Sequence, residues 1–308
     1  MAYLVFDAGG TFTKYALMNE KTDILERGKF ITPDYTSGTK EAFICMISDV
    51  IEGYKDRIEG IAISMPGMLD SDAGYCVTAG YLAYLCGTAL AEILCEKYKF
   101  PVTIENDGKC AALAEFWKGS LRGCTNGAVL VLGSGVGGGL IIDKKLYKGR
   151  RQTAGEFSYV AVEEEQKYEL DGYWGMKSGF QGFAKRVAFY TGEDWEKYDG
   201  RQLFERAMSG DEKVLKGLKD FTDSLALQVC NLNMLLDLDV VAVGGGISCQ
   251  PLLHEYLEKS IDEYMENHPM RFLSPYIPRP VVTNCKFYND ANLIGALYHF
   301  LNKKGGAV

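Results

Sequence analysis

Short apolar runs alternate with longer amphipathic segments along the chain. Residues 3–6 and 128–132 are continuously apolar, as strands buried on both faces are. Each run leads into a glycine-rich loop, which is followed by an extended segment, a polar turn and a second extended segment. The same strand–loop–hairpin unit is therefore predicted twice. A third apolar run, residues 240–243, ends in three glycines before a predicted helix.

The remaining amphipathic segments have the spacing of helices. They cover, approximately, residues 39–54, 88–98, 109–117, 180–191, 202–208, 211–236, 251–265 and 290–303. Asp290 and Asn292 are expected to cap the last of these helices. Strands and helices in alternation predict an α/β protein. We expect two domains: residues 1–118, with the terminal helix within 289–308 packing back on them, and residues 119–288.

Composition narrows the class of protein. With 308 residues and 47% hydrophobic content, the chain can bury a large core. The net charge of −8 argues against a nucleic-acid-binding surface, which would need a basic face. The apolar runs are too short to cross a membrane, and the pattern of a signal peptide is missing. We therefore expect a cytoplasmic protein with neither nucleic-acid nor membrane partners.

The cysteines and histidines suggest no metal site and no disulfide framework. The nine cysteines are scattered without a Cys-x-x-Cys pair and are expected to be reduced. Those in helical or apolar stretches are interpreted as small buried hydrophobic residues: Cys45, Cys95, Cys110 and Cys230. His254, His268 and His299 match no metal-ligand spacing. We expect these histidines to be surface or capping residues.

Three glycine loops carry the candidate chemistry. Close approach of the main chain to a polyphosphate needs residues without a Cβ, so that N–H groups converge on the phosphate oxygens. The loops contribute the following candidates for ATP binding: Asp7, Gly9, Gly10, Thr11, Gly133, Gly135, Gly137, Gly138, Gly244, Gly245 and Gly246. Each loop alone is more often a tight turn, but three in one chain favour a site for nucleotide phosphates.

The second loop also matches the dinucleotide-binding fingerprint, with glycines at 133, 135 and 138. That fingerprint needs a helix directly after the glycines. Here residues 140–147 have the pattern of strand, polar turn and strand. A hairpin is therefore predicted instead of a Rossmann helix.

Five ordered motifs resemble those of the ROK family, which contains bacterial sugar kinases and sugar-responsive repressors. They are Asp7-Ala8-Gly9-Gly10-Thr11, Glu105-Asn106-Asp107, the 133–139 loop, Ala154-Gly155-Glu156 and Gly244-Gly245-Gly246-Ile247. The resemblance covers essentially the whole chain. It implies the two-domain actin/Hsp70/hexokinase-like fold, an α/β fold with duplicated strand–loop–hairpin cores, and it implies ATP and Mg²⁺ as cofactors.

Two departures set further expectations within the family. ROK repressors carry a DNA-binding winged helix before the first motif, which here begins at Asp7, so an enzyme is expected. Many members bind structural zinc through a cysteine cluster and a histidine. This chain has no cysteine between Cys124 and Cys230, and Tyr159 stands where the histidine is usual. The resemblance therefore implies no zinc site and is nearest to zinc-free β-glucoside kinases.

The resemblance also implies roles for single residues. Asp107 would be the general base that orients the sugar hydroxyl and accepts its proton; taken alone, it would be the N-cap of the following helix. Asp7 would hold Mg²⁺ through water. The sugar-binding residues would be Asn106, Glu156, Glu105, Gly67, Gly80 and Tyr159. Tyr159 would either contact the sugar or fill the space that the metal site leaves.

The expected function is ATP-dependent phosphorylation of a hexose or β-glucoside at the 6-hydroxyl. A glucokinase or an N-acetylhexosamine kinase is the nearest alternative, and a non-catalytic sugar sensor is an alternative from another class. An actin-like ATPase without a sugar substrate is disfavoured by Asn106, Asp107 and Glu156. The protein is expected to form a homodimer.

Overall fold

The structure is a computed structural model that describes residues 1–305, apart from the side chains of residues 274 and 275. The chain divides into two compact units. The first comprises Met1–Lys118, Leu146–Ala154 and the segment from Asn289, and the second comprises Gly119–Lys145 and Gly155–Tyr288. The structure thus differs from the predicted domain 119–288 by placing Leu146–Ala154 with the first unit. Residues 306–308 of the predicted terminal segment lie outside the described part.

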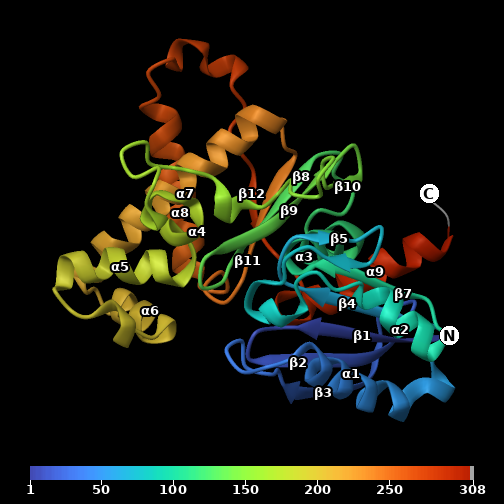
Figure 1. Cartoon of the computed structure of the whole chain (residues 1–308). Coiled ribbons are helices and arrows are strands. Elements are labelled where there is room, and N and C mark those ends of the chain that lie inside the picture. The colour runs from blue at the N-terminus through green and yellow to red at the C-terminus, as the bar shows by residue number, and fades with distance from the viewer. Residues whose placement is uncertain (306–308) are drawn as a thin grey trace. The chain divides into compact units, whose positions relative to one another are not determined.

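The first unit is built on a five-stranded sheet in the order β3-β2-β1-β4-β7 (Figure 1). Its strands are β1 (Ala2–Ala8), β2 (Phe12–Asn19), β3 (Ile24–Ile31), β4 (Ile61–Met65) and β7 (Val102–Asn106). Strand β1 is antiparallel to β2 and parallel to β4, which is parallel to β7. The α-helices are α1 (Lys40–Tyr54), α2 (Leu90–Tyr98), α3 (Asp107–Lys118) and α9 (Ala291–Gly305). Shorter elements are η1 (Lys55–Arg57), β5 (Leu69–Asp70), β6 (Tyr75–Cys76), η2 (Gly80–Leu85) and η7 (Tyr288–Asp290).

Helices α1 and α2 cover one face of this sheet. Helix α1 begins after Thr39, whose hydroxyl accepts a hydrogen bond of 3.1 Å from the N–H of Ala42. It buries Phe43, Ile47 and Ile51, which recur every four residues and so lie on one side of the helix. These side chains pack against apolar residues of β1, β4 and β7 in one core.

Helix α9 packs on the same sheet and crosses α3 closely. The Phe300 ring of α9 lies 5.3 Å from the ring of Tyr3 in β1. A Cβ on Gly295 would lie 1.8 Å from the carbonyl oxygen of Cys110 in α3, so the crossing requires a glycine. The C-terminal helix therefore completes the fold of the N-terminal unit.

The second unit repeats the strand arrangement in a sheet of order β10-β9-β8-β11-β12. Its strands are β8 (Gly127–Leu132), β9 (Val136–Ile142), β10 (Lys145–Tyr147), β11 (Val240–Gly244) and β12 (Val282–Asn284). As in the first sheet, the central strand β8 is antiparallel to its hairpin partner and parallel to the strand on its other side. The α-helices are α4 (Trp174–Lys177), α5 (Gly179–Thr191), α6 (Gly200–Met208), α7 (Glu212–Leu236) and α8 (Pro251–Glu266). The 3₁₀ helices are η3 (Phe157–Tyr159), η4 (Leu170–Gly172), η5 (Trp195–Lys197) and η6 (Arg271–Tyr276).

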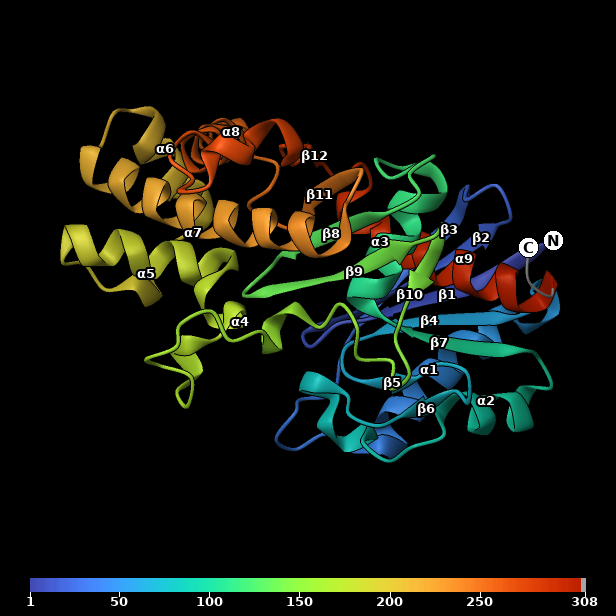
Figure 2. The same ribbon diagram turned by 90° about the horizontal axis from the view of Figure 1, so that it is seen from above.

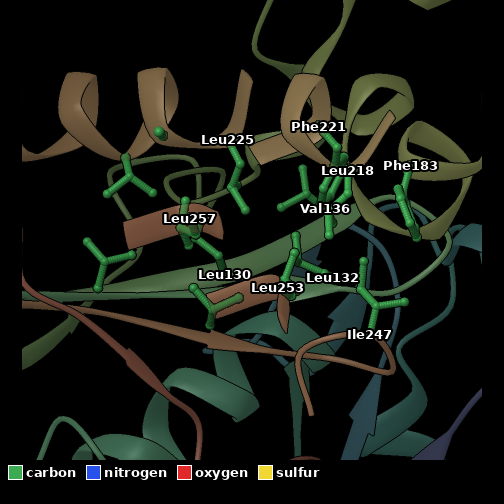
Figure 3. Close-up of a cluster of buried hydrophobic side chains, with 14 of the residues drawn as sticks. Leu130, Leu132, Val136, Phe183, Leu218, Phe221, Leu225, Ile247, Leu253 and Leu257 are labelled. Atoms are coloured by element: carbon green, nitrogen blue, oxygen red, sulfur yellow. The ribbon is translucent and has the colours of Figure 1, made fainter. Parts of the chain in front are cut away.

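Helices α5, α7 and α8 share one core with this second sheet. Figure 2 shows α5 and α7 side by side. In Figure 3, Leu130 and Leu132 of β8 lie in one cluster with Phe221 and Leu225 of α7 and Leu257 of α8. The aromatic rings of this core are in contact: Phe183 lies 5.7 Å from Phe221. The rigid sheet that carries the second and third glycine loops is held by this cluster.

The structure confirms both strand–loop–hairpin units and the absence of a Rossmann helix after the second loop, where β9 and β10 follow. Three details of the sequence interpretation are wrong. Helix α3 begins at Asp107 instead of residue 109, directly after β7, which includes Glu105 and Asn106. Cys45 and Cys95 are exposed, whereas Cys110 and Cys230 are buried as expected. His299, a residue of α9, is buried instead of lying at the surface, because tertiary packing covers the face of the helix on which it lies.

Candidate active site

Polar residues lie in register across the carboxyl ends of the three parallel strands in the first unit. Asp7 of β1 is paired with Ser64 of β4, which is paired with Glu105 of β7. Registered residues of parallel strands point to the same face of the sheet. All three are buried, Asp7 to 8%, Ser64 to 0% and Glu105 to 1% exposure. The carboxyl edge of this sheet therefore carries the polar residues of the unit, as is usual for ligand sites in α/β proteins.

Asp7 is held by groups from two other elements. The side-chain amide of Asn292, in the first turn of α9, donates to Asp7 Oδ1 at 3.0 Å. Lys14 Nζ lies 3.8 Å from Asp7 Oδ2. Burial raises the pKa of the Asp7 carboxyl, while the contacts with Asn292 and Lys14 act in the opposite direction. Asn292, which the sequence suggested as a helix cap, thus contacts this carboxylate.

The first glycine loop is a tight turn braced from β3. The N–H of Gly9 donates to the carbonyl of Phe12 at 3.2 Å. The hydroxyl of Thr32 donates to the carbonyl of Gly9 at 2.7 Å. A Cβ on Gly10 would lie 3.1 Å from Tyr81 Cβ of η2. Gly10 and Thr11 are exposed at the tip of this turn.

Asn106 organises the corner at which β7 passes into α3. We refer to Glu105, Asn106 and Asp107 as the strand-to-helix corner. Asn106 Oδ1 accepts from the N–H of Lys109 at 3.1 Å, and its amide Nδ2 donates to the carbonyl of Gly67 at 3.0 Å. Asn106 is therefore the N-cap of α3. The capping role that the sequence left open for Asp107 belongs to its neighbour.

Asp107 is the first residue of α3 and is half-buried. Its Oδ1 accepts from the N–H of Gly108 at 2.8 Å. Because it stands at a helix N-terminus, its negative charge is favoured by the helix dipole. The position combines a fixed main chain with a carboxylate that is accessible in part, as a base in a reaction requires.

Gly67 and Gly80 shape the loop against which Asn106 is fixed. Gly67 has φ +103° and a Cβ on it would lie 2.5 Å from the carbonyl oxygen of Thr78. Gly80 has φ +52° and would place a Cβ 3.1 Å from Pro66. Both glycines are thus required by the backbone itself, which accounts for them without a ligand.

In the second unit, the glycines at 133–138 divide into two classes. A Cβ on Gly135 would lie 2.4 Å from the carbonyl oxygen of Gly175, and one on Gly138 would lie 1.9 Å from that of Val129. These two are therefore required by packing. A Cβ on Gly133 or Gly137 would meet nothing within 4 Å. Close packing within the chain gives no reason for glycine at those two exposed positions.

The start of α5 fixes the same loop. The N–H of Phe180 donates to the carbonyl of Gly133 at 2.8 Å, and that of Gln181 donates to the carbonyl of Ser134 at 3.2 Å. The first N–H groups of a helix have no partner within the helix, and here they orient the loop carbonyls. Within the loop, the N–H of Gly133 donates to the carbonyl of Gly135 at 3.0 Å.

The third loop lies beside the second. Gly245 has φ +95° and a Cβ on it would lie 2.2 Å from the carbonyl oxygen of Leu132, the last residue before the second loop. A Cβ on Gly244 would lie 2.9 Å from Cys285 Sγ, whereas one on Gly246 would meet nothing within 4 Å. The hydroxyl of Ser248 closes the turn by donating to the carbonyl of Gly245 at 2.9 Å.

In the second unit, Glu156 directly precedes η3 and Tyr159 is the last residue of η3. Gly155, with φ +81°, packs against the main chain of Gly139 in β9. Glu156 is half-buried, whereas Tyr159 is 65% exposed. This exposure is incompatible with the space-filling role that the sequence allowed for Tyr159. The interior here is filled instead by Phe157 and Trp174, whose rings are 5.3 Å apart.

The segment after η3 is closed by pairing between its own ends. The N–H of Trp174 donates to the carbonyl of Val160 at 2.8 Å, and that of Val162 donates to the carbonyl of Gly172 at 2.9 Å. Lys177 and Glu163 add an ion pair of 2.7 Å.

Among the described residues, no group of three or more His, Cys, Asp or Glu could hold a metal ion. No helix in residues 1–305 is both long and apolar enough to span a membrane.

The structure therefore gathers the predicted site residues into two groups, one in each unit. The first unit holds Asp7, Gly9, Gly10, Thr11, Gly67, Gly80, Glu105, Asn106 and Asp107. The second holds Gly133, Gly135, Gly137, Gly138, Glu156, Tyr159, Gly244, Gly245 and Gly246. Sequence reasoning missed Lys14, Asn292, Lys148 and His299. No local pattern marks them, because only folding brings them to Asp7 and Glu105.

Comparison with known proteins agrees with this architecture. The ROK family model matches residues 3–303, and the chain belongs to the ROK family. The chain is 30% identical to an N-acetyl-D-glucosamine kinase of Vibrio vulnificus over 98% of this chain and 100% of that protein. It is 28% identical to a β-glucoside kinase of Klebsiella pneumoniae over 97% and 96%. A ROK family protein of Streptococcus pneumoniae, crystallised with sucrose, superposes with a TM-score of 0.86 at 26% identity and 99% coverage of both chains. The chain therefore has the actin/hexokinase-like fold of ROK proteins.

His299 gives a test of the buried polar row. Burial lowers the pKa of His299 to about 4, against the opposing effect of Glu105. Because the native state binds this proton less readily than the unfolded state, stability should be unaffected above pH 6.5 and should fall between pH 6.5 and about 4. The shift corresponds to roughly 3 kcal/mol of unfolding free energy at the acid end.

The measurement is denaturant unfolding of wild type and His299→Gln between pH 7 and pH 4. The variant lacks the titrating group, so its stability relative to wild type should increase on acidification. His268→Gln, just after the end of α8 in the second unit, is the matched control and should follow wild type. If the unfolding free energy of wild type and of His299→Gln changed with pH in parallel, that would contradict the burial of a neutral imidazole at this position.

Proposed function

We propose that this protein is a sugar kinase that transfers a phosphoryl group from ATP to a hydroxyl of a hexose or glucoside. The observation that carries the proposal is the strand-to-helix corner. It presents a carboxylate at the N-terminus of α3, while its neighbour Asn106 supplies the helix cap. Membership of the ROK family and the kinase names of the two relatives support the same reaction.

We assign the general base to Asp107. A carboxylate beside the attacking hydroxyl orients it and accepts its proton as the phosphoryl group is transferred. Asn106 retains one amide hydrogen and one acceptor lone pair beyond its bonds with Gly67 and Lys109, and these suit a sugar hydroxyl. Glu156 is proposed as a second sugar ligand, since a carboxylate can accept from two hydroxyls. Tyr159, being exposed, is proposed to contact the sugar or its substituent.

We assign the phosphates to the exposed turn of the first loop and to the glycines of the second unit. Gly133, Gly137 and Gly246 are the positions at which a Cβ would meet nothing in the protein. Bare main chain at these positions fits the close approach of phosphate or nucleoside. Asp7, with a hard carboxylate oxygen at the end of β1, fits Mg²⁺ held through water. The metal, when bound, would neutralise charge on the phosphates.

We propose a β-glucoside or free hexose as the acceptor, phosphorylated at the 6-hydroxyl. The motif around Glu156 and Tyr159 supports this choice, as does the β-glucoside kinase relative. An N-acetylhexosamine is the second candidate, because the relative at 30% identity is named as an N-acetyl-D-glucosamine kinase. Ser158 donates its hydroxyl to the carbonyl of Val136 and so braces η3 against β9.

Asp107→Asn should lower the turnover of sugar phosphorylation by a factor on the order of 10²–10⁴, because the proton acceptor is lost while the shape is kept. Unfolding stability and nucleotide affinity should stay close to wild type. The measurement is coupled ADP release at saturating sugar and ATP, with Asp49→Asn in α1 as a matched surface control. Turnover of Asp107→Asn within a few-fold of wild type would exclude Asp107 as the base.

Gly137→Ala should raise the KM for ATP about tenfold, equivalent to about 1.4 kcal/mol, because a methyl group would separate main chain and phosphate. The KM for sugar should change less than threefold. Gly53→Ala is the matched control, since a Cβ there also meets nothing within 4 Å but lies on α1. If Gly137→Ala leaves the KM for ATP unchanged, as Gly53→Ala should, the second loop does not approach the phosphates at this position.

Glu156→Gln should raise the KM for the sugar at least tenfold and leave the KM for ATP nearly unchanged, because a site built to bind hydroxyls discriminates through paired polar groups. The acceptor is identified by ADP release over cellobiose, arylglucosides, glucose, mannose and N-acetylhexosamines. Turnover of an amino sugar with none on β-glucosides would select the second candidate. Sugar binding without turnover on any acceptor would favour the sensor.

We also propose that the protein holds no structural zinc, because main-chain pairing and the ion pair of Glu163 with Lys177 close the 160–174 segment. Protein purified without added metal should contain far less than one zinc per chain by elemental analysis. Treatment with EDTA should leave the unfolding midpoint unchanged. One zinc per chain, removable with loss of structure, would contradict this.

A further inference from the structure

Glu105 is a buried carboxylate whose two oxygens have different surroundings. It is 1% exposed. Its Oε1 accepts from the main-chain N–H of Asn106 at 2.9 Å. Its Oε2 is buried without a hydrogen-bond partner among the described residues. Withdrawing a carboxylate from water in this way is costly unless a counter-charge is near.

Among the described residues, Lys148 and His299 lie within ion-pair distance of Oε2, and Lys148 supplies the charge. Lys148 Nζ lies 3.5 Å away and His299 Nδ1 lies 3.6 Å away. Burial lowers the pKa of His299 to about 4, so its ring is neutral at neutral pH. The counter-charge of Glu105 is therefore the ammonium group of Lys148.

Lys148 is itself fixed by the turn between β5 and β6. Its ammonium donates to Ser71 Oγ at 2.7 Å and lies 3.4 Å from Asp72 Oδ1. Gln152, four residues later, accepts from both the N–H and the hydroxyl of Ser71 at 2.9 Å. Lys148 and Gln152 thus anchor the segment Leu146–Ala154 to the turn between β5 and β6.

Glu105, the partner of Lys148, is connected to Asp107 through the main chain and the cap of α3. Glu105 fixes the main chain of Asn106, Asn106 caps α3, and Asp107 is the first residue of that helix. Displacing Glu105 would therefore move the corner on which the proposed base stands. A shift of about 1 Å in such a group can lower a rate about 100-fold.

We propose that Lys148 is a positioning residue of the kinase, which pairs with the buried Glu105 side chain, holds it in place and so sets the position of Asp107. This inference rests on the proposed function, since it concerns the geometry of the proposed base. Lys148 touches neither sugar nor phosphate in this assignment, and it acts only through the buried ion pair.

The test is a double-mutant cycle on Lys148→Met and Glu105→Gln, measured as turnover at saturating sugar and ATP with the KM for each. Lys148→Met should lower turnover on the order of 10- to 100-fold, with the KM for ATP within threefold of wild type. Glu105→Gln keeps the acceptor for the Asn106 N–H and removes the buried charge. In that background, Lys148→Met should cost less than a further threefold. Lys148→Arg, which keeps the charge, should retain most of the activity.

Lys303→Met is the matched control. Lys303 donates to the main-chain carbonyls of Ser71 and Asp72 from the last turn of α9. Its loss loosens the same turn while Lys148 and Glu105 remain. Near wild-type turnover in Lys303→Met is expected, and a loss as large as that of Lys148→Met would assign the effect to the turn and overturn the proposal.

Three further outcomes would overturn the inference: turnover of Lys148→Met within threefold of wild type, equal losses from Lys148→Met in both backgrounds, or a Lys148→Arg enzyme as impaired as Lys148→Met. If Lys148→Met fails to fold, the double variant decides, because it buries no unpaired charge. It should then fold and be active, and its failure to do so would contradict the pairing. Absence of activity in the wild-type protein would instead refute the proposed function.

Discussion

Two carboxylates, Asp7 and Glu105, are withdrawn from water between the first sheet and α9. An isolated buried carboxylate is destabilising by several kcal/mol. Each of these two is matched by groups brought from distant parts of the chain. Asn292 and Lys14 contact Asp7, and Lys148 lies within ion-pair distance of Glu105. In the proposed assignment the position of Asp107 depends on this matched burial, because Glu105 is the first residue of the strand-to-helix corner and accepts from the N–H of Asn106.

The two units use the same strand arrangement for different tasks. In the first, the carboxyl ends of β1 and β7 carry acidic residues and the turn after β1 is braced by Thr32. In the second, the ends of β8 and β11 carry glycines, and no carboxylate occupies the registered positions of β8 and β11. A duplicated scaffold thus supports one acidic edge and one edge of bare main chain. This division suits a reaction in which one substrate must be deprotonated and the other is a polyanion.

The glycines of such loops are not equivalent. Gly135, Gly138 and Gly245 are required because another part of the main chain passes within 2.4 Å of where a Cβ would stand. Gly133, Gly137 and Gly246 have open space at that place. A glycine motif therefore combines residues that shape the loop with residues that leave room for a ligand. In the proposed assignment the latter face the ligand, so substitution there should separate binding from folding.

The sequence alone determined the repeated strand–loop–hairpin units, most helices to within a few residues, and the order of motifs that identifies the family. These features depend on local periodicity, turn chemistry and short spacings, which a linear sequence carries. It also placed Asp107 at the start of a helix, although it left the capping role open. The local hydrogen bonds of the corner then gave that role to Asn106.

Only the tertiary structure decided which distant residues meet. His299 was expected to be a surface or capping residue but lies on the buried face of α9 beside Glu105, and Asn292 contacts Asp7 across 285 residues of sequence. The segment Leu146–Ala154 joins the first unit although its neighbours on both sides belong to the second. None of these contacts has a local signature, because each arises from the packing of elements against one sheet. The charge balance of a buried site is set by such packing and therefore cannot be derived from the order of residues alone.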